Sequence, residues 1–414
     1  IEIIGAMISH AHNKLNSDTI VSVIMVLIYP FWGFMYVVIF SLYRVLLFKK
    51  INVKNVAFCF AFFLAILAFT QETTSGDLAR VYHSTESLYT TNFVDFFIKS
   101  YMVDRYFIFS TINYLLYSIF GEIRAISFFW VFFIYYLLFL SVYYIVIYKK
   151  ISYPYRTIVI IWIISVFSLV IFTQVTEIMK QAVAASIFIY SYTLYLRHKY
   201  LLALSSILIT FFIHSTIIFF LPLFFVDRFK LKVVALLCVA SFLFRSFNLM
   251  AFVSSVLGYL NVFPSLVEVS EVYGEYDGSF FSSNAPFFIL AFWSFVILVA
   301  VDYIDKYKMD PPLLKVALMY VIILNLNYSV DHNFTRMLTL LYPFYLLLLV
   351  DLFDRKRLSK RSLKMVVLFF LLITTGLNYK MVFSRISRSS TYSTSFVDNS
   401  FLNLVRYNIL DYLK

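Results

Sequence analysis

Long apolar runs, separated by short loops rich in lysine and arginine, are the feature that most constrains how this chain can fold. Runs of about 18 or more mainly apolar residues recur along its whole length, and 62% of its 414 residues are hydrophobic. A run of that length is enough to cross a bilayer as an α-helix. We therefore expect one all-α, polytopic membrane domain over residues 1–414, with about twelve transmembrane helices.

The net charge of +12 does not indicate nucleic-acid binding, because the cations lie between the apolar runs. Such loops are typical of the cytoplasmic side of a membrane protein. On this basis the polar stretches 71–92 and 246–285 are external loops, and the second is the longest. The loops that set the orientation are Lys49–Lys50, Lys149–Lys150, Arg197–Lys199, Asp227–Lys232 and Asp354–Lys364.

Two segments do not fit a simple alternation of spans. Residues 93–120 carry four charges, and a span there would leave Lys149 and Lys150 on the wrong side. We expect this segment to lie at the outer surface or to re-enter, as amphipathic segments can. If the 27-residue run from Tyr200 to Val226 were a single helix, the cations that follow it would lie on the outer side. We therefore expect a hairpin that turns near His214.

In this topology a minority of cations fall at the outer face, beside acidic and neutral polar residues. Solvated loop charges and interhelical salt bridges are one interpretation. The other is an outward-facing cavity for an anionic ligand, since arginine suits phosphate. The cations are Arg80, Lys180, Arg245 and Arg336, and the nearby polar residues are Asp77, Glu177, Gln181, Asp331 and His332.

The histidines and cysteines leave few chemical options. His214 lies within an apolar run and is either a hydrogen-bonded structural residue or part of a site. His332 follows Asp331 and is either a base oriented by that carboxylate or a loop residue. Cys59 and Cys238 lie in apolar runs without metal-ligand spacing. With no HExxH, CxxC or Walker motif either, we expect no metal and no cofactor.

Four segments of the chain form a recognisable pattern. They are GDLARVY (with Gly76, Asp77 and Tyr82), EIMKQAVAASI (Glu177–Ile187), FFIHSTIIFFLPL (Phe211–Leu223) and NFTRMLTLLYPF (Asn333–Phe344). Together they resemble the Wzy/EpsG-type polysaccharide polymerases of bacterial envelopes. Lys180 stands where that family usually has arginine. The arginine expected before the Gly-x-Asp loop is missing, although Arg80 lies nearby.

The resemblance implies an all-helical fold related to membrane-embedded, GT-C-like glycosyltransferases that use polyprenyl-linked donors. It also implies an enzyme of the bacterial inner membrane whose active site faces the periplasm. Such an enzyme joins oligosaccharide units carried on undecaprenyl pyrophosphate into O-antigen (as in lipopolysaccharide), capsule or exopolysaccharide. Membrane lipid and a chain-length regulator of the Wzz type are its expected partners.

Pyrophosphate is a stable leaving group, so this reaction needs cations beside it and a base near the attacking hydroxyl. Three alternatives to the polymerase function remain open: a glycan ligase, a membrane acyltransferase and a lipid-linked oligosaccharide flippase. The expected catalytic residues are Asp77, Glu177, His332 and Arg336. The expected substrate-binding and pyrophosphate-binding residues are Arg80, Lys180, Gln181, His214, Arg245 and Tyr328.

Overall fold

A computed structural model describes residues 20–70, 77–89, 92–103, 106–169, 175–176, 178–241 and 312–326, together with a few isolated positions. These residues are helical or connect helices, and no strand occurs among them. The all-α prediction is therefore confirmed. The 246–285 loop lies almost wholly outside the described residues, as do the spans expected after residue 326.

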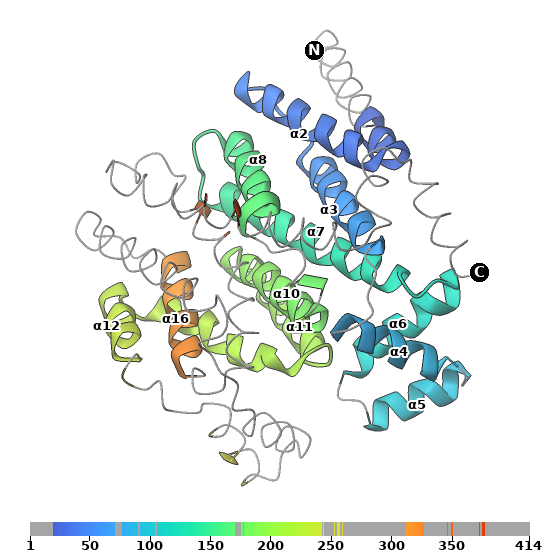
Figure 1. Cartoon of the computed structure of the whole chain (residues 1–414). Coiled ribbons are helices and arrows are strands. Elements are labelled where there is room, and N and C mark those ends of the chain that lie inside the picture. The colour runs from blue at the N-terminus through green and yellow to red at the C-terminus, as the bar shows by residue number, and fades with distance from the viewer. Residues whose placement is uncertain are drawn as a thin grey trace, which may run out of the picture.

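Three helices form the centre of the fold: α3 (Val53–Phe69), α7 (Ala125–Tyr148) and α10 (Met179–Leu196). The long α7 packs against both of the others (Figure 1). It is apolar on all sides, which is typical of a helix covered all round by protein or lipid. With 24 residues it extends roughly 36 Å, enough to cross the ~30 Å hydrocarbon core of a bilayer.

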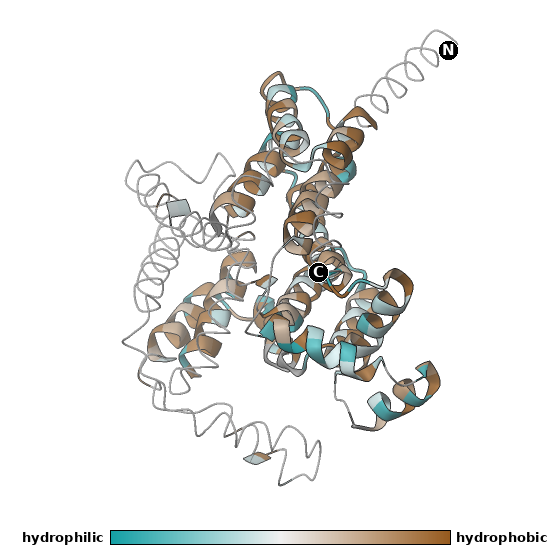
Figure 2. Cartoon of the chain, turned by 45° about the vertical axis from the view of Figure 1, so that its right-hand side comes forward, coloured by the Kyte–Doolittle hydropathy of each residue, from teal (hydrophilic) through white to brown (hydrophobic). Residues whose placement is uncertain are grey.

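Further apolar helices surround this centre. They are shorter than α7, the one described helix that is both long and apolar enough to span a membrane. Figure 2 shows hydrophobic colours along most of the helical ribbon. Leu201 and Leu236 are 84% and 70% exposed, as side chains that face lipid would be. The further elements are α2 (Pro30–Leu46), α8 (Pro154–Ile164) with a π-helical turn η1 (Ser165–Leu169), α11 (Tyr200–Phe211), the 3₁₀ helix η2 (Ser215–Arg228), α12 (Leu231–Ser241) and α16 (Pro312–Leu326).

The helices α2, α7 and α10 end together, and we call this the basic end. Each is closed by a non-glycine residue in the left-handed conformation: Phe48, Lys150 and His198. In each case the next N–H bonds to a carbonyl five residues back, as in a Schellman motif. The Phe48 ring lies 5.2 Å from that of Tyr153, and the Arg197 guanidinium lies 4.3 Å from the Tyr144 ring centroid. The predicted loops Lys49–Lys50, Lys149–Lys150 and Arg197–Lys199 follow these three helix ends and therefore lie at one end of the fold.

The opposite end, here the distal end, holds α4 (Asp77–Leu88), α5 (Phe93–Val103) and α6 (Phe107–Phe120). Ser127 at the start of α7 donates to the Ala68 carbonyl at the end of α3, at 3.2 Å. The chain therefore leaves α3 and enters α7 at one place. The segment 93–120 forms two helices, α5 and α6, joined at residues 104–106.

The prediction of a polar loop over residues 71–92 is wrong for residues 77–88, because these residues form the helix α4. Its buried residues are Leu78, Val81, Tyr82 and Thr85, at the i, i+3, i+4 and i+7 positions of one helix face. The polar composition concealed this periodicity, because only a narrow stripe of α4 is covered.

The hairpin near His214 is confirmed. Beyond the turn, η2 returns to the basic end, where Asp227 accepts a hydrogen bond from the Tyr192 hydroxyl at 3.4 Å. Lys315 of α16 donates to the carbonyls of Asp227 and Phe229, at 3.1 and 2.9 Å. Pro222 lies inside η2, and its ring is incompatible with regular α-helical hydrogen bonding.

Candidate functional site

Residues from α6, α10 and the α11–η2 turn meet at the distal end around Tyr106, which lies between α5 and α6. The Lys180 ammonium, near the start of α10, is 5.0 Å from the Tyr106 ring centroid and 5.3 Å from that of Phe109. The His214 ring, at the α11–η2 turn, stacks on Tyr106 at 5.0 Å with an interplanar angle of 9°. Lys180 and His214, both predicted as site residues, are thus linked through one aromatic ring.

The start of α10 is electrostatically positive. Its N-cap residue is Ile178, which has no side-chain acceptor for the first N–H groups of the helix. These N–H groups and the helix dipole attract anions. Lys180 adds a full charge in the first turn, steadied by two aromatic rings. The arrangement suits a phosphate or diphosphate group.

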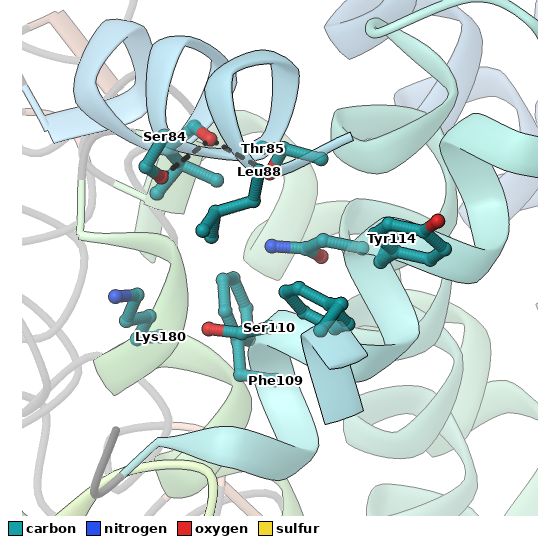
Figure 3. Close-up of a pocket in the computed structure, with 10 residues that line it drawn as sticks. Ser84, Thr85, Leu88, Phe109, Ser110, Tyr114 and Lys180 are labelled. Carbon is teal, nitrogen blue, oxygen red and sulfur yellow. Dashed lines mark hydrogen bonds between the residues drawn. The ribbon is translucent and has the colours of Figure 1, made fainter. Parts of the chain in front are cut away.

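A pocket opens beside Lys180, between α4, α5, α6 and α10. It holds about 280 Å³ of empty space, its open mouth included. Figure 3 shows Ser84, Thr85 and Leu88 on one side, Phe109 and Ser110 on another, and Lys180 at the edge. The remaining lining residues are Val81, Phe96, Asn113 and Tyr114.

Asp77 and Arg80 form an ion pair within the first turn of α4. The Arg80 side chain is 76% exposed and does not line the pocket. Asp77 precedes Ser84 by seven residues, two turns of helix, and therefore shares its face of α4. A rise of 1.5 Å per residue separates the two positions by about 10 Å along the axis. Asp77 is therefore near the pocket, but not in it.

Gln181 is buried beside Lys180, with 8% of its surface exposed. Among the described residues, its Oε1 atom has no hydrogen-bond partner. Leaving a buried acceptor unpaired costs roughly 1–3 kcal/mol. Gln181 does not line the pocket.

The other predicted site residues lie outside the described residues. They are Glu177, Arg245, Tyr328, His332 and Arg336. Within the described part, no three His, Cys, Asp or Glu residues gather as metal ligands.

Sequence reasoning missed the pocket residues of α4 and α6. The signal was present in FIFSTINYLLYSIF, where Ser110, Asn113 and Tyr114 occupy one helix face of an apolar run. Their spacing of three and four residues predicts neighbours. The chain reversal that brings this face opposite α4 and Lys180 has no comparable signature.

The apolar helices, the basic end and a polar, cationic distal pocket are those of an all-helical membrane protein with a candidate site at one end of its helices. The EpsG family model matches residues 81–395, and the chain belongs to this family of polysaccharide polymerase-type proteins. Searches of curated proteins and of solved structures found no match. The predicted Wzy/EpsG-type family is confirmed.

Proposed function

We propose that this chain polymerises undecaprenyl-pyrophosphate-linked oligosaccharide units into a surface polysaccharide. The observation that carries the proposal is the position of Lys180 at the distal end, opposite the clustered cations of the basic end. Loops rich in lysine and arginine remain in the cytoplasm. The Lys180 site therefore faces the outer side of the bacterial inner membrane, where lipid-linked units are displayed.

The reaction transfers the growing chain from its lipid carrier to the incoming unit. The bond between the anomeric carbon and the pyrophosphate oxygen breaks, and the carbon bonds to a sugar hydroxyl of the incoming unit. The hydroxyl proton passes to a base, and the pyrophosphate keeps the electron pair. Lys180 and the start of α10 stabilise that charge. Asp77 is the base candidate on the same face of α4 as the pocket, and Arg336 is a further cation.

A glycosyltransferase with this architecture would have about twelve membrane helices and a GT-C-like relationship to other polyprenyl-dependent enzymes. Its partners would be the lipid-linked unit, membrane lipid and a Wzz-type chain-length regulator. The described polar groups beside the pocket lie toward one end of the helices. A flippase would need such groups along its path through the membrane, so the arrangement favours transfer at one face.

The test is polymer synthesis by the purified full chain in liposomes, supplied with lipid-linked units from source cells that lack it. We expect Lys180→Gln to reduce polymer at least 100-fold and Lys180→Arg to retain most activity. Arg197→Gln at the basic end is the matched control and should remain active. Normal polymer length with Lys180→Gln would remove this residue from the mechanism. Transfer to lipid A core, acylated sugar or transport without bond formation would establish the ligase, acyltransferase or flippase instead.

A further inference from the structure

The Asn113 side chain presents a fixed hydrogen-bond donor to the pocket. Its Oδ1 atom accepts a hydrogen bond from Trp130 Nε1 at 2.7 Å. Because the indole N–H can only donate, this bond fixes which end of the amide is which. The Nδ2 group has no hydrogen-bond partner within the described part of the chain. Asn113 is 2% exposed and lines the pocket. With Oδ1 held by Trp130, the Nδ2 group is the polar atom that it can offer to a ligand there.

Two hydroxyls on the α4 side present acceptors. Ser84 Oγ and Thr85 Oγ1 each donate their hydrogen to the Val81 carbonyl, both at 2.9 Å (Figure 3). A hydroxyl has one hydrogen and two lone pairs. With the hydrogens committed to Val81, the lone pairs are what these oxygens offer to the pocket.

The remaining walls are aromatic and apolar. The rings of Phe96 and Tyr114 stack at 4.4 Å and 15°, and Phe109 stacks on Trp130 at 4.9 Å and 13°. Leu88 closes the α4 side. These contacts hold the walls in place, so the donor and the acceptors keep their relative positions.

A ligand for this pocket must both accept and donate hydrogen bonds and also cover apolar surface. A phosphate oxygen accepts only, so the lone pairs of Ser84 and Thr85 would repel it. A sugar hydroxyl does both, and the C–H face of a sugar ring packs on aromatic side chains. The empty space of about 280 Å³, with the open mouth included, is an upper limit on what the pocket can take. This limit excludes an oligosaccharide and leaves room for one sugar residue at most.

On the basis of the polymerase function above, we propose that this pocket is a subsite for one neutral sugar residue of the substrate. It lies next to the diphosphate position at Lys180 and is chemically distinct from it. The Asn113 amide donates to one sugar hydroxyl, and Ser84 and Thr85 accept from others. Lys180 lines both regions and marks the boundary between them.

The variants remove one of these interactions at a time. Asn113→Asp keeps the acceptor for Trp130 and removes the donor, and Thr85→Val and Ser84→Ala remove the acceptors. Ser87→Ala is the matched control, because Ser87 lies on the exposed face of α4 and its hydroxyl donates to the Ser84 carbonyl. In the liposome assay we expect a 3- to 10-fold rise in KM for the pocket variants, with kcat changed less. The control should match the unaltered chain.

A binding experiment separates the subsite from the polymerase function. The purified full chain is heated with a panel of methyl glycosides of neutral hexoses and N-acetylhexosamines, or with inorganic pyrophosphate. We expect at least one glycoside to raise the melting temperature of the unaltered chain and of Ser87→Ala, but not of Thr85→Val or Asn113→Asp. Pyrophosphate protection should be lost in Lys180→Gln and kept in Thr85→Val.

Each outcome bears on the subsite. Glycoside protection without polymer synthesis would leave the subsite standing and remove the polymerase function. Polymer synthesis with unchanged KM in all three pocket variants, or with no glycoside protecting the chain, would overturn the subsite. Loss of pyrophosphate protection in Thr85→Val would assign the pocket to the anion instead.

Discussion

The Lys180 ammonium lies 5.0 Å from the ring centroid of Tyr106, a residue 74 positions earlier in the chain. The same ring stacks on His214. Lys180 is half-buried, and the aromatic rings beside it restrict the position of its ammonium group. Tyr106 is therefore a positioning residue that sets where the cation stands.

We predict that the ring of Tyr106, rather than its hydroxyl, is what Lys180 requires. A cation–π contact contributes roughly 0.5–2 kcal/mol, or about a 2- to 30-fold effect. Tyr106→Leu should weaken protection by pyrophosphate within that range and lower the rate of polymer synthesis, whereas Tyr106→Phe should restore both. Equal losses in the two variants would show that the hydroxyl acts and that the ring does not.

We predict that Gly33→Ala destabilises the protein. A Cβ at this position would lie 2.4 Å from the backbone carbonyl carbon and oxygen of Met25 and from the nitrogen of Val26. Such overlap with backbone typically costs 1–3 kcal/mol. The control is Gly376→Ala, where nothing lies within 4 Å of the added carbon. Thermal unfolding in detergent should show a lower melting temperature for Gly33→Ala alone.

We predict a pH-dependent contribution from the ion pair between Glu122 and Arg124 in the α6–α7 loop. Burial raises the pKa of Glu122. Two side-chain hydrogen bonds from Arg124 at 2.8 Å, a backbone hydrogen bond from the same residue and its positive charge lower that pKa by more than burial raises it. The net pKa is therefore below its ordinary value of 4.5. A carboxyl with a lowered folded-state pKa stabilises the fold above its unfolded pKa. That stability is lost as pH falls through the folded pKa.

The measurement is the melting temperature of Glu122→Gln against the unaltered chain at several pH values. The variant should melt lower at neutral pH, and the difference should shrink below pH 4.5. Glu86→Gln on the exposed face of α4 serves as the control and should show no such trend. A difference that stays constant down to pH 3 would contradict the ion-pair contribution.

We predict that Lys150→Gly stabilises the end of α7. Lys150 has a φ of 51°, and the left-handed conformation costs a non-glycine residue roughly 1–2 kcal/mol. Glycine removes that strain but loses more backbone entropy on folding, so a net gain of about 0.5 kcal/mol is expected. Lys149→Gly is the matched comparison, because Lys149 has a right-handed φ of −75°. Chemical denaturation should rank Lys150→Gly above the unaltered chain and Lys149→Gly below it.

Much of the fold was readable from local patterns. The helix α3, Val53–Phe69, is one of the apolar runs of the sequence, and a run of that length in a bilayer has the helix as its stable state. The turn at His214 followed from the charges after Val226, which could not be left on the outer side. The helix α4 was missed, since its covered stripe is narrow and its other faces are polar.

The sequence by itself determined the all-helical class, the basic end, the family resemblance and the choice of Lys180 as a candidate site residue, because apolar length, loop charge and short motifs are local properties. The tertiary structure decided that Tyr106 lies between Lys180 and His214 and that Trp130 turns the Asn113 donor toward the pocket. These relationships join residues from distant parts of the chain. They depend on how the helices pack, which no local pattern encodes.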